Sequence, residues 1–599
     1  MNFLSPWAKT HPSTLINAFG CAFIISVLLT WGVIHVATKR GWVAKPRAQR
    51  WHTRPTALFG GLALFGSCAI ASFFFLPGSP AYWPLVVGGV LMFGAGLWDD
   101  LREMTPRHKI YIQLAAALWF ITLYYNASPP QQTWLIPIAL VWLIGIINAV
   151  NLLDNMDGLS TGVSAIGALF MAAYALHIGD AFVAVGGLII AGACLGFLVW
   201  NFNPAKIFMG DCGALFLGFC LGGLSLASQT SLQSSNFVFA LLLPVLVLAT
   251  PLFDTLFVAM VRFINDRPVL LGGRDHTSHR LVMLGLSERR AVLWLYGVAL
   301  WFGLLGIYGV THESFALVIA LTLLSWIGML VLGLFLSEVK AYDHLEEDSE
   351  RKRRGSRILA RHRRRILDAF LDITSIGASW TLAFLLRYED APFDHLSEMA
   401  TTLPFVMVCV FGAFFLTGIY HSLWRYVTLS DLFVLGRTAL IGCVATWLAC
   451  RFFLPHIQLS TSVLVIFFLL LIASSGGFRL GFKALRYHFS LHYKRDVKRV
   501  LVFGAGDMGE LVVREMLLSA EAAFQPVGFI DDDPQKQRLS IHGVKVLGTR
   551  NQLLEMIARH RIDEVLIALT HGSPEVASEV RGMCQTCGVG CREVRRLAV

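Results

Sequence analysis

Long apolar segments recur along most of this 599-residue chain, and they restrict its fold more than any other feature. A stretch of about 18 or more apolar residues can cross a bilayer as a helix. Hydrophobic residues make up 56% of the chain and charged residues only 15%, whereas soluble proteins carry about 25% charged residues. The sequence therefore predicts a polytopic α-helical membrane protein.

The apolar segments fall into two groups. We expect eleven spans in the first group, near residues 14–36, 57–77, 82–98, 109–126, 133–150, 159–178, 181–200, 213–230, 236–260, 291–311 and 313–337. Four more are expected near residues 366–386, 401–420, 434–454 and 460–482. A basic stretch at 341–365 separates the groups, either as a solvated linker or as a segment lying on anionic lipid headgroups.

The loops between the expected spans differ sharply in charge. Loops on one side carry many Lys and Arg residues, among them Lys39, Arg54, Arg102 and Arg262, while those on the other side carry none. Basic loops stay in the cytoplasm. We therefore expect the N-terminus outside the membrane and the basic loops inside. The net charge of +10 is then explained without nucleic acid.

The last hundred residues change character. Short β-rich runs at 500–503, 527–530 and 564–568 alternate with helical stretches, which is typical of an α/β domain with a parallel sheet. The expected organisation is a polytopic domain at 1–340, a basic linker at 341–365, a four-span unit at 366–490, and a Rossmann-like cytoplasmic domain at 495–599.

Polar residues collect at the expected cytoplasmic ends of the spans. Such groups are costly near a bilayer, so they call for a functional hypothesis. The candidates are Asp99, Asp100, Lys109, Asn148, Asn151, Asp154, Asp157, Asp211, Arg274, His276 and His279. Each motif alone has an ordinary explanation, because an Asp-Asp pair can simply cap a span and a His-x-x-His loop can simply be exposed. Their shared face makes a site the better interpretation.

Carboxylates and amides without thiolates suit a hard cation such as Mg²⁺, with Mn²⁺ as an alternative. Mg²⁺ commonly bridges substrate phosphates, and phosphoryl transfer also needs cationic side chains where two phosphates meet. Lys109, Arg274, His276 and His279 are the candidates for that role.

Residues 1 to about 340 resemble the polyprenyl-phosphate N-acetylhexosamine-1-phosphate transferases. The matching motifs are Trp98-Asp-Asp100, Asn148-x-x-Asn151-x-x-Asp154-x-x-Asp157-Gly158, Phe208-Met-Gly-Asp211, Asp275-His-x-x-His279-Arg-Leu281, His52-x-Arg54-Pro55 with Gly60-Gly61, and Lys109 with Gln113. Thr277 and Ser278 depart from the denser histidine run of relatives.

The resemblance implies a role for each candidate. Asp211 would be the principal Mg²⁺ ligand, and Asp154 and Asp157 would organise metal and nucleotide, with Asp157 as a second ligand. Asp99 and Asp100 would stand near the lipid phosphate, one of them as a base. Asn148, Asn151, Lys109 and Arg274 would bind substrate, and His276 and His279 would contact the pyrophosphate.

The implied substrates are a UDP-sugar and undecaprenyl phosphate in a bacterial inner membrane, with UMP released. A homodimer and downstream glycosyltransferases are further candidate partners. Direct displacement and an aspartyl-phosphate intermediate both remain open, with direct displacement favoured.

Residues from about 366 onward resemble the N-terminal region of membrane-bound nucleotide-sugar 4,6-dehydratases. Gly418-Ile-Tyr420-x-x-x-Trp424-Arg-Tyr426 and Gly504-Ala-Gly506-Asp-Met-Gly509 carry this likeness. The glycines and Asp531 would bind a nucleotide or nucleotide-sugar. A Tyr-x-x-x-Lys pair is absent after residue 495, so a regulatory or docking module is favoured over a dehydratase. A non-catalytic scaffold for glycan assembly is the remaining alternative.

Overall fold

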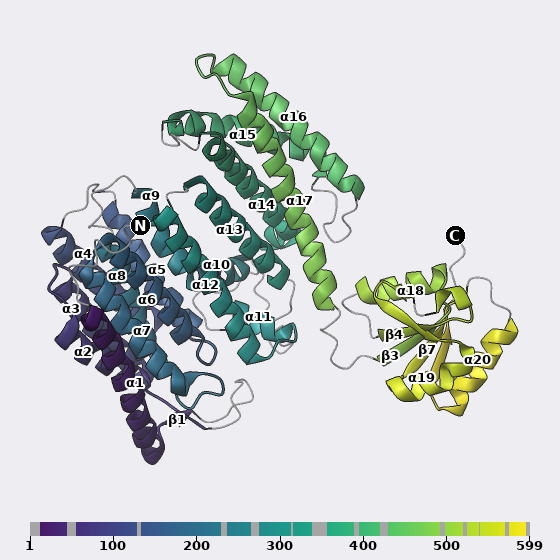
Figure 1. The fold of residues 1–599 in the computed structure, drawn as a ribbon, viewed down its shortest axis with the longest axis horizontal. Coiled ribbons are helices and arrows are strands. Elements are labelled where there is room, and N and C mark those ends of the chain that lie inside the picture. The colour runs from purple at the N-terminus through teal and green to yellow at the C-terminus, as the bar shows by residue number, and fades with distance from the viewer. Residues whose placement is uncertain are drawn as a thin grey trace. The chain divides into compact units, whose positions relative to one another are not determined.

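We analysed a computed structural model of the chain, shown in Figure 1. The structure describes residues 12–44, 55–128, 133, 135–228, 237–264, 273, 275–312, 315–337, 356–388, 394–419, 429–490, 498–518, 524–537, 539–569 and 574–594. Two compact units divide between Arg479 and Leu480. The first is helical and the second is an α/β unit.

The first unit is built from apolar helices. Those before residue 340 are α1 (Pro12–Arg40), α2 (Gly61–Phe75), α3 (Tyr82–Arg102), α4 (Pro106–Ala127), α5 (Leu135–Leu153), α6 (Leu159–Ile178), α7 (Ala181–Asn201), α8 (Gly210–Ala227), α9 (Phe237–Val247), α10 (Ala249–Ile264), α11 (Thr277–Met283), α12 (Glu288–His312) and α13 (Phe315–Ser337). Four more follow, namely α14 (Ser356–Arg387), α15 (Leu396–Leu416), α16 (Leu429–Phe453) and α17 (Thr461–Ser490).

Among the residues that the structure describes, 13 helices are long and apolar enough to cross a membrane. Two predicted spans differ from this pattern. The predicted span at 57–77 is the shorter helix α2, which has 15 residues. The predicted span at 236–260 is divided into α9 and α10 at Leu248. Pro251 has no N–H to donate to the Val247 carbonyl, and its ring clashes with that carbonyl, which explains an interruption there.

Helix α8 forms the centre of the first unit. Of the most apolar stretch of α8, 89% is buried inside the protein, against 17% for α1. Helices α2, α3, α5, α6 and α7 all pack on α8, and α1 lies outside them against α7. Residues at the ends of the surrounding helices can therefore contact the ends of α8.

A small hairpin lies beside the start of α8. Strand β1 (Val43–Ala44) pairs antiparallel with β2 (Thr56–Ala57). The Ala57 N–H donates to the Lys206 carbonyl at 3.2 Å, and the Phe208 N–H donates to the Ala57 carbonyl at 2.9 Å. These bonds fix the segment that leads into α8. His52 and Arg54 lie outside the described residues.

The second unit contains a six-stranded sheet in the order β5-β6-β4-β3-β7-β8. Its strands are β3 (Lys498–Phe503), β4 (Phe524–Ile530), β5 (Ser540–Ile541), β6 (Val544–Gly548), β7 (Glu564–Ile567) and β8 (Gly590–Glu593). All pairs are parallel except β5 with β6. The three predicted strands are present, and the predicted parallel pairing is confirmed for them.

Successive side chains of a strand point to opposite faces of the sheet and pack into two separate hydrophobic cores. Val500 and Val502 pack on one face with α18 (Asp507–Leu518). Leu501 and Phe503 pack on the other face with α19 (Leu553–His560) and α20 (Pro574–Thr586). This period of two is the reason that a short run of consecutive apolar residues forms a strand covered on both faces.

Gly96 controls the contact between α3 and α8, and its replacement by Ala should be harmful. A Cβ atom at Gly96 would lie 2.4 Å from both the Asp211 carbonyl oxygen and the Cys212 Cα atom. We expect Gly96→Ala to reduce the free energy of unfolding by about 1–3 kcal/mol, the usual effect of overpacking. The measurement is the thermal unfolding midpoint of the detergent-purified protein.

Gly94→Ala is the matched control, because it lies on the same helix and a methyl group added there would have nothing within 4 Å. Alanine is the better helix former, so this variant should unfold at the same temperature or higher. Equal losses in the two variants would contradict the close-contact explanation.

Candidate active site at the start of helix α8

Asp99, Lys109 and Asp211 meet at the start of α8. The Lys109 ammonium forms ion pairs with Asp99, at the end of α3, and with Asp211 Oδ2 at 2.5 Å. The side chains of Lys109 and Asp211 are 24% and 30% exposed. This lysine therefore bridges two carboxylates in a place that a soluble ligand can reach.

Asn151 completes this arrangement from α5. Its Nδ2 donates to Asp211 Oδ1 at 2.9 Å, so each oxygen of Asp211 has a different partner. We call Asp99, Lys109, Asn151 and Asp211 the carboxylate cluster. The four residues come from four helices and are drawn together from positions more than 100 residues apart.

Asp100 lies next to the cluster but contacts backbone. Its Oδ1 accepts from the Asp211 N–H at 2.9 Å, and its Oδ2 accepts from the Cys212 N–H at 3.1 Å. The first N–H groups of a helix have no partner within the helix. Asp100 thus caps α8 from another helix.

Asp154 and Asp157 occupy the turn after α5. Burial raises the pKa of Asp154 to about 8, and the negative charges of Asp211, Asp100 and Asp157 contribute to this rise. Asp157 Oδ2 instead accepts from the Ala205 N–H at 2.9 Å and from the Asn203 amide at 3.4 Å. Besides burial, the negative charge of Asp211 therefore raises the pKa of Asp154. Asp157 instead stabilises the segment before α8 through its hydrogen bonds.

Asn148 lies one turn before Asn151 and faces α4. Its Nδ2 donates to Gln113 Oε1 at 2.8 Å, and Gln113 Nε2 donates back to Asn148 Oδ1 at 3.3 Å. Gln113 is buried. This reciprocal amide pair joins α4 to α5 and thereby aligns Lys109 with Asn151.

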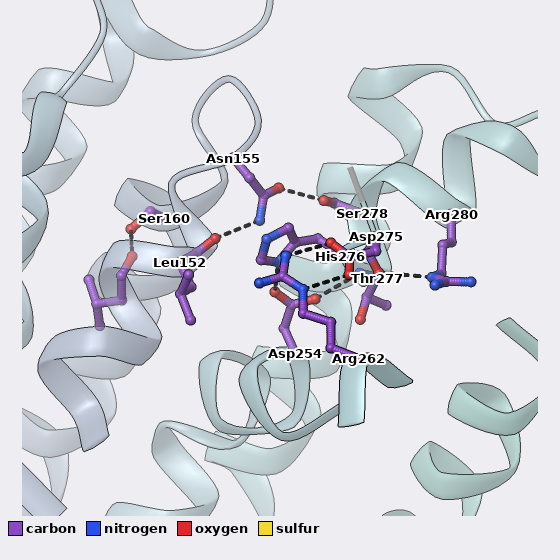
Figure 2. Close-up of polar contacts among 11 residues, drawn as sticks. Leu152, Asn155, Ser160, Asp254, Arg262, Asp275, His276, Thr277, Ser278 and Arg280 are labelled. Atoms are coloured by element: carbon purple, nitrogen blue, oxygen red, sulfur yellow. Dashed lines mark hydrogen bonds and ion pairs between the residues drawn. The ribbon is translucent and has the colours of Figure 1, made fainter. Parts of the chain in front are cut away.

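A second buried group surrounds the predicted histidines, and Figure 2 shows its contacts. His276 Nδ1 lies 2.8 Å from Asp254 Oδ2, and the Thr277 N–H donates to Asp254 Oδ1 at 2.7 Å. Arg262 donates to both oxygens of Asp275, at 2.7 and 2.6 Å. We call Asp254, Arg262, Asp275, His276 and Thr277 the histidine cluster.

The two clusters are connected through the turn after α5. Ser278 Oγ donates to Asn155 Oδ1 at 2.6 Å, and Asn155 Nδ2 donates to the Leu152 carbonyl at 2.8 Å. His279 is buried, with its ring centre 6.3 Å from that of His276. Arg274 lies outside the described residues.

Sequence reasoning did not single out Asp254, and it assigned Arg262 to a basic loop. The structure instead places both residues on α10, buried and eight residues apart, about 80° from each other around the helix. Two charged residues at this spacing in an apolar helix were the available signal. Their partners are Asp275 and His276, and the spacing of residues within a helix cannot predict such contacts with a distant segment.

The donor chemistry of the carboxylate cluster fits a hard cation, since its ligating atoms are carboxylate and amide oxygens. Several negative charges also surround one lysine there. Among the described residues, however, there is no group of three His, Cys, Asp or Glu side chains already placed to hold a metal ion. Mg²⁺ is usually held by only one or two protein carboxylates together with substrate phosphates.

In the second unit, the predicted glycine loop follows β3, where the strand order reverses. Gly504 has a φ of +104°, and a Cβ atom at Gly509 would lie 1.9 Å from the Gly504 carbonyl oxygen. The Ala505 N–H donates to Asp531 Oδ2 at 2.7 Å, and Lys536 Nζ lies 3.2 Å from the same oxygen. The structure therefore brings Asp531 to the loop that contains Gly504, Gly506 and Gly509.

The environment of Asp531 favours its charged form. Burial alone would raise its pKa, but N–H groups of Asp533 and Ala505 and the Lys536 ammonium hold the pKa below its usual value. This carboxylate is thus already engaged by protein groups at the mouth of the loop.

Comparison with known proteins assigns the segment that contains the carboxylate cluster to a protein family. The sequence model described as Glycosyl transferase family 4 matches residues 82–229, which include the carboxylate cluster. The "Probable undecaprenyl-phosphate N-acetylglucosaminyl 1-phosphate transferase" of Bacillus subtilis (strain 168) is 34% identical over 292 residues, covering 46% of this chain and 80% of that protein. The chain belongs to glycosyl transferase family 4.

Other proteins similar to this family 4 transferase are also phosphosugar transferases by name. The decaprenyl-phosphate N-acetylglucosaminephosphotransferase of Mycolicibacterium smegmatis (strain ATCC 700084 / mc(2)155) is 35% identical and covers 47% of this chain and 78% of the relative. The phospho-N-acetylmuramoyl-pentapeptide-transferase of Synechococcus sp. (strain RCC307) is 31% identical, with 47% and 85% covered. With its many apolar helices, the protein is a multi-pass membrane transferase.

The later part of the family 4 transferase matches other proteins. A sequence model described as a CoA-binding domain matches residues 416–575. The crystal structure of UDP-D-quinovosamine 4-dehydrogenase from Vibrio fischeri is 26% identical and covers 17% of this chain and 80% of that chain, with a TM-score of 0.16. A likeness at this TM-score carries no conclusion about ligand or activity.

Removing Arg262 from the histidine cluster should be strongly destabilising. The Arg262 and Asp275 side chains are 3% and 2% exposed, so Arg262→Met would leave a buried carboxylate without its cation. We expect a loss of about 3–5 kcal/mol in the free energy of unfolding. The measurement is thermal unfolding of the purified protein, with the exposed Arg290→Met as control.

Adding Asp275→Asn to Arg262→Met should recover part of that loss, because the second substitution removes the isolated charge. A double variant whose loss equals the sum of the single losses would contradict this pairing.

Proposed function

We propose that this family 4 transferase moves an N-acetylhexosamine 1-phosphate from a UDP-sugar to undecaprenyl phosphate and releases UMP. The observation that carries the proposal is the carboxylate cluster, which lies within the family match and is partly exposed. The names of the relatives, which contain polyprenyl phosphate and N-acetylglucosamine, support the choice of substrates.

The proposed reaction is one displacement at phosphorus. An oxygen of the lipid phosphate attacks the phosphorus that carries the sugar, the bond to the bridging oxygen breaks, and that oxygen leaves on UMP. The lipid phosphate is already anionic, so the protein mainly positions the reactants and offsets their charge. Lys109 and Asn151 each contact one oxygen of Asp211 and thereby orient this carboxylate.

The cationic and amide groups would bind the substrates. We assign Lys109, Asn148 and Asn151 to the donor side, with Asn148 acting through Gln113. His276 and His279 would contact the pyrophosphate, and the contact between His276 and Asp254 would fix the orientation of the ring. Asp99 would stand nearest the lipid phosphate.

Mg²⁺ is the proposed cofactor, with Mn²⁺ as a substitute. Asp211 would be its principal ligand, and Asp154 and Asp157 would supply further carboxylates from the turn after α5. Bound there, the ion would neutralise the phosphate charge that develops during transfer.

The charge of the loops supports an active site on the cytoplasmic face of a bacterial inner membrane. The carboxylate cluster lies at the end of α3 and the start of α8. Arg102 is at that end of α3, and Lys206 lies in the segment that leads into α8. Basic loops remain in the cytoplasm. We propose a regulatory or docking role for the C-terminal half, because no Tyr-x-x-x-Lys pair of a dehydratase follows residue 495.

Asp211→Asn should abolish the transfer reaction. The substitution removes the charge that faces Lys109, and we expect at least a roughly 100-fold loss, comparable to losing one preorganised electrostatic group. The measurement uses purified protein, Mg²⁺, undecaprenyl phosphate and a panel of radiolabelled UDP-N-acetylhexosamines, with UMP and labelled lipid as readouts.

Asp180→Asn is the matched control. Asp180 caps α7 at the end away from Asn201 by accepting from the Val183 N–H at 3.0 Å, so its loss should leave the rate unchanged. Wild-type protein that forms no labelled lipid with any donor would contradict the proposed function and favour the scaffold alternative.

Chelation should also stop the reaction. Treatment with EDTA is expected to remove all measurable transfer, because the crowded carboxylates and substrate phosphates then lack their cation. Added Mg²⁺ or Mn²⁺ should restore it, and the protein should still show a cooperative unfolding transition in EDTA, which separates loss of the cation from loss of the fold. Full activity in excess EDTA would exclude the metal role.

A further inference from the structure

The two adjacent carboxylates at the end of α3 face different groups. Asp99 contacts Lys109 and accepts a hydrogen bond from the Met104 N–H. Asp100 makes its hydrogen bonds to the first turn of α8. Consecutive residues of a helix project about 100° apart, so one side chain reaches the open cluster while its neighbour reaches the backbone of α8.

Asp100 supplies the cap that α8 lacks in its own sequence. Met209 precedes α8 and provides no side-chain hydrogen bond to the helix. Asp100 satisfies two of the unpaired N–H groups, one with each oxygen. A carboxylate is also favoured there by the positive end of the helix dipole. These two N–H groups are therefore not available to a substrate phosphate.

Gly210 fits closely against the same carboxylate. Its φ is +76°, a conformation that favours glycine. A Cβ atom at this position would lie 2.7 Å from Asp100 Oδ2 and 3.0 Å from Asp100 Oδ1. The turn into α8 and the position of Asp100 therefore depend on each other.

Asp211 is the residue that this contact holds. Its N–H binds Asp100, and its carboxylate lies between Lys109 and Asn151. We infer that Asp100 is a positioning residue, which orients Asp211 by capping α8 and neither takes a proton from the lipid phosphate nor binds the cofactor. This inference rests on the proposed function, and it assigns the two neighbouring carboxylates to different tasks.

The test is a double-mutant cycle between Asp100 and Gly210 in the full-length protein. Asp100→Ala removes both hydrogen bonds, and Gly210→Ala pushes a methyl group against the carboxylate. Each single variant should lower kcat on the order of 100-fold, because small displacements of a reacting group have effects of that size. Gly210→Ala should slow the Asp100→Ala enzyme by a smaller factor than it slows the wild type, since the conflict with the carboxylate is then gone and only the strain of the positive φ remains. Effects that multiply would overturn the inference.

A second readout separates positioning from substrate contact. Asp100→Asn keeps one carbonyl oxygen that can accept an N–H, so it should recover at least about tenfold of the kcat lost in Asp100→Ala. The KM for undecaprenyl phosphate should equal the wild-type value in both variants. A raised KM for this lipid, or an Asp100→Asn enzyme as slow as Asp100→Ala, would assign Asp100 to the substrate instead.

Thermal unfolding tests the inference independently of the reaction. Gly210→Ala should lower the unfolding midpoint at least about twice as much in the wild-type background as in the Asp100→Ala background. Asp100→Asn replaces that background if Asp100→Ala does not fold. Wild-type protein without any transfer would refute the proposed function, while this comparison of midpoints would still decide the capping role. Equal losses in the two backgrounds would overturn it.

Discussion

The contact between α3 and α8 is the constraint on which the site depends. Gly96 removes the side chain that would otherwise separate the helices, and the backbone of Asp211 and Cys212 fills that space. Gly61 does the same for α2, where a Cβ atom would lie 2.3 Å from the Gly213 nitrogen. Small residues allow helices to approach closely in membranes, where dispersion rather than hydrophobic burial holds them together. Only at this distance can the end of α3 reach the start of α8.

Burial divides the polar groups into those that stabilise the structure and those that a ligand can reach. Arg262 and Asp275 are nearly fully buried and pair with each other, and the buried Asp254 is hydrogen-bonded to the His276 ring and the Thr277 N–H. Lys109 and Asp211 have partners too, but 24% and 30% of these side chains are exposed. A preorganised site needs both classes, because groups that meet the substrate must already be oriented when it binds.

Much of this could be predicted from sequence, and the failures have physical reasons. Apolar length predicted helices, alternation predicted β3, β4 and β7, and the motif residues Asp99, Lys109, Asn151 and Asp211 do lie together. Their metal and substrate roles stay predictions. Sequence spacing could not distinguish Asp100 from Asp99, because that difference depends on where α8 crosses α3.

The histidine cluster could be predicted only in part, for a related reason. His276 and His279 were expected, but Asp254 and Arg262 were not, since side-chain pairs between α10 and a distant loop leave no periodic signal. Asp157 was predicted to be a second metal ligand with Asp211, and that role stays a prediction; its hydrogen bonds go to Asn203 and Ala205. Pro251, by contrast, is visible in the sequence as a residue that interrupts a helix, and the predicted single span at 236–260 did not take it into account.

Helix α11 shows why these tertiary contacts matter. It has only 7 residues, and isolated helices shorter than about 12 residues are marginal in water. Asp254 caps it at the Thr277 N–H, and Ser278 donates to Asn155 in the turn after α5. Arg280 donates to the Leu336 carbonyl at the end of α13. Two helices and one turn therefore fix this short element. Because Asn155 lies only four residues after Asn151, the segment that contacts α11 also carries the amide bound to Asp211.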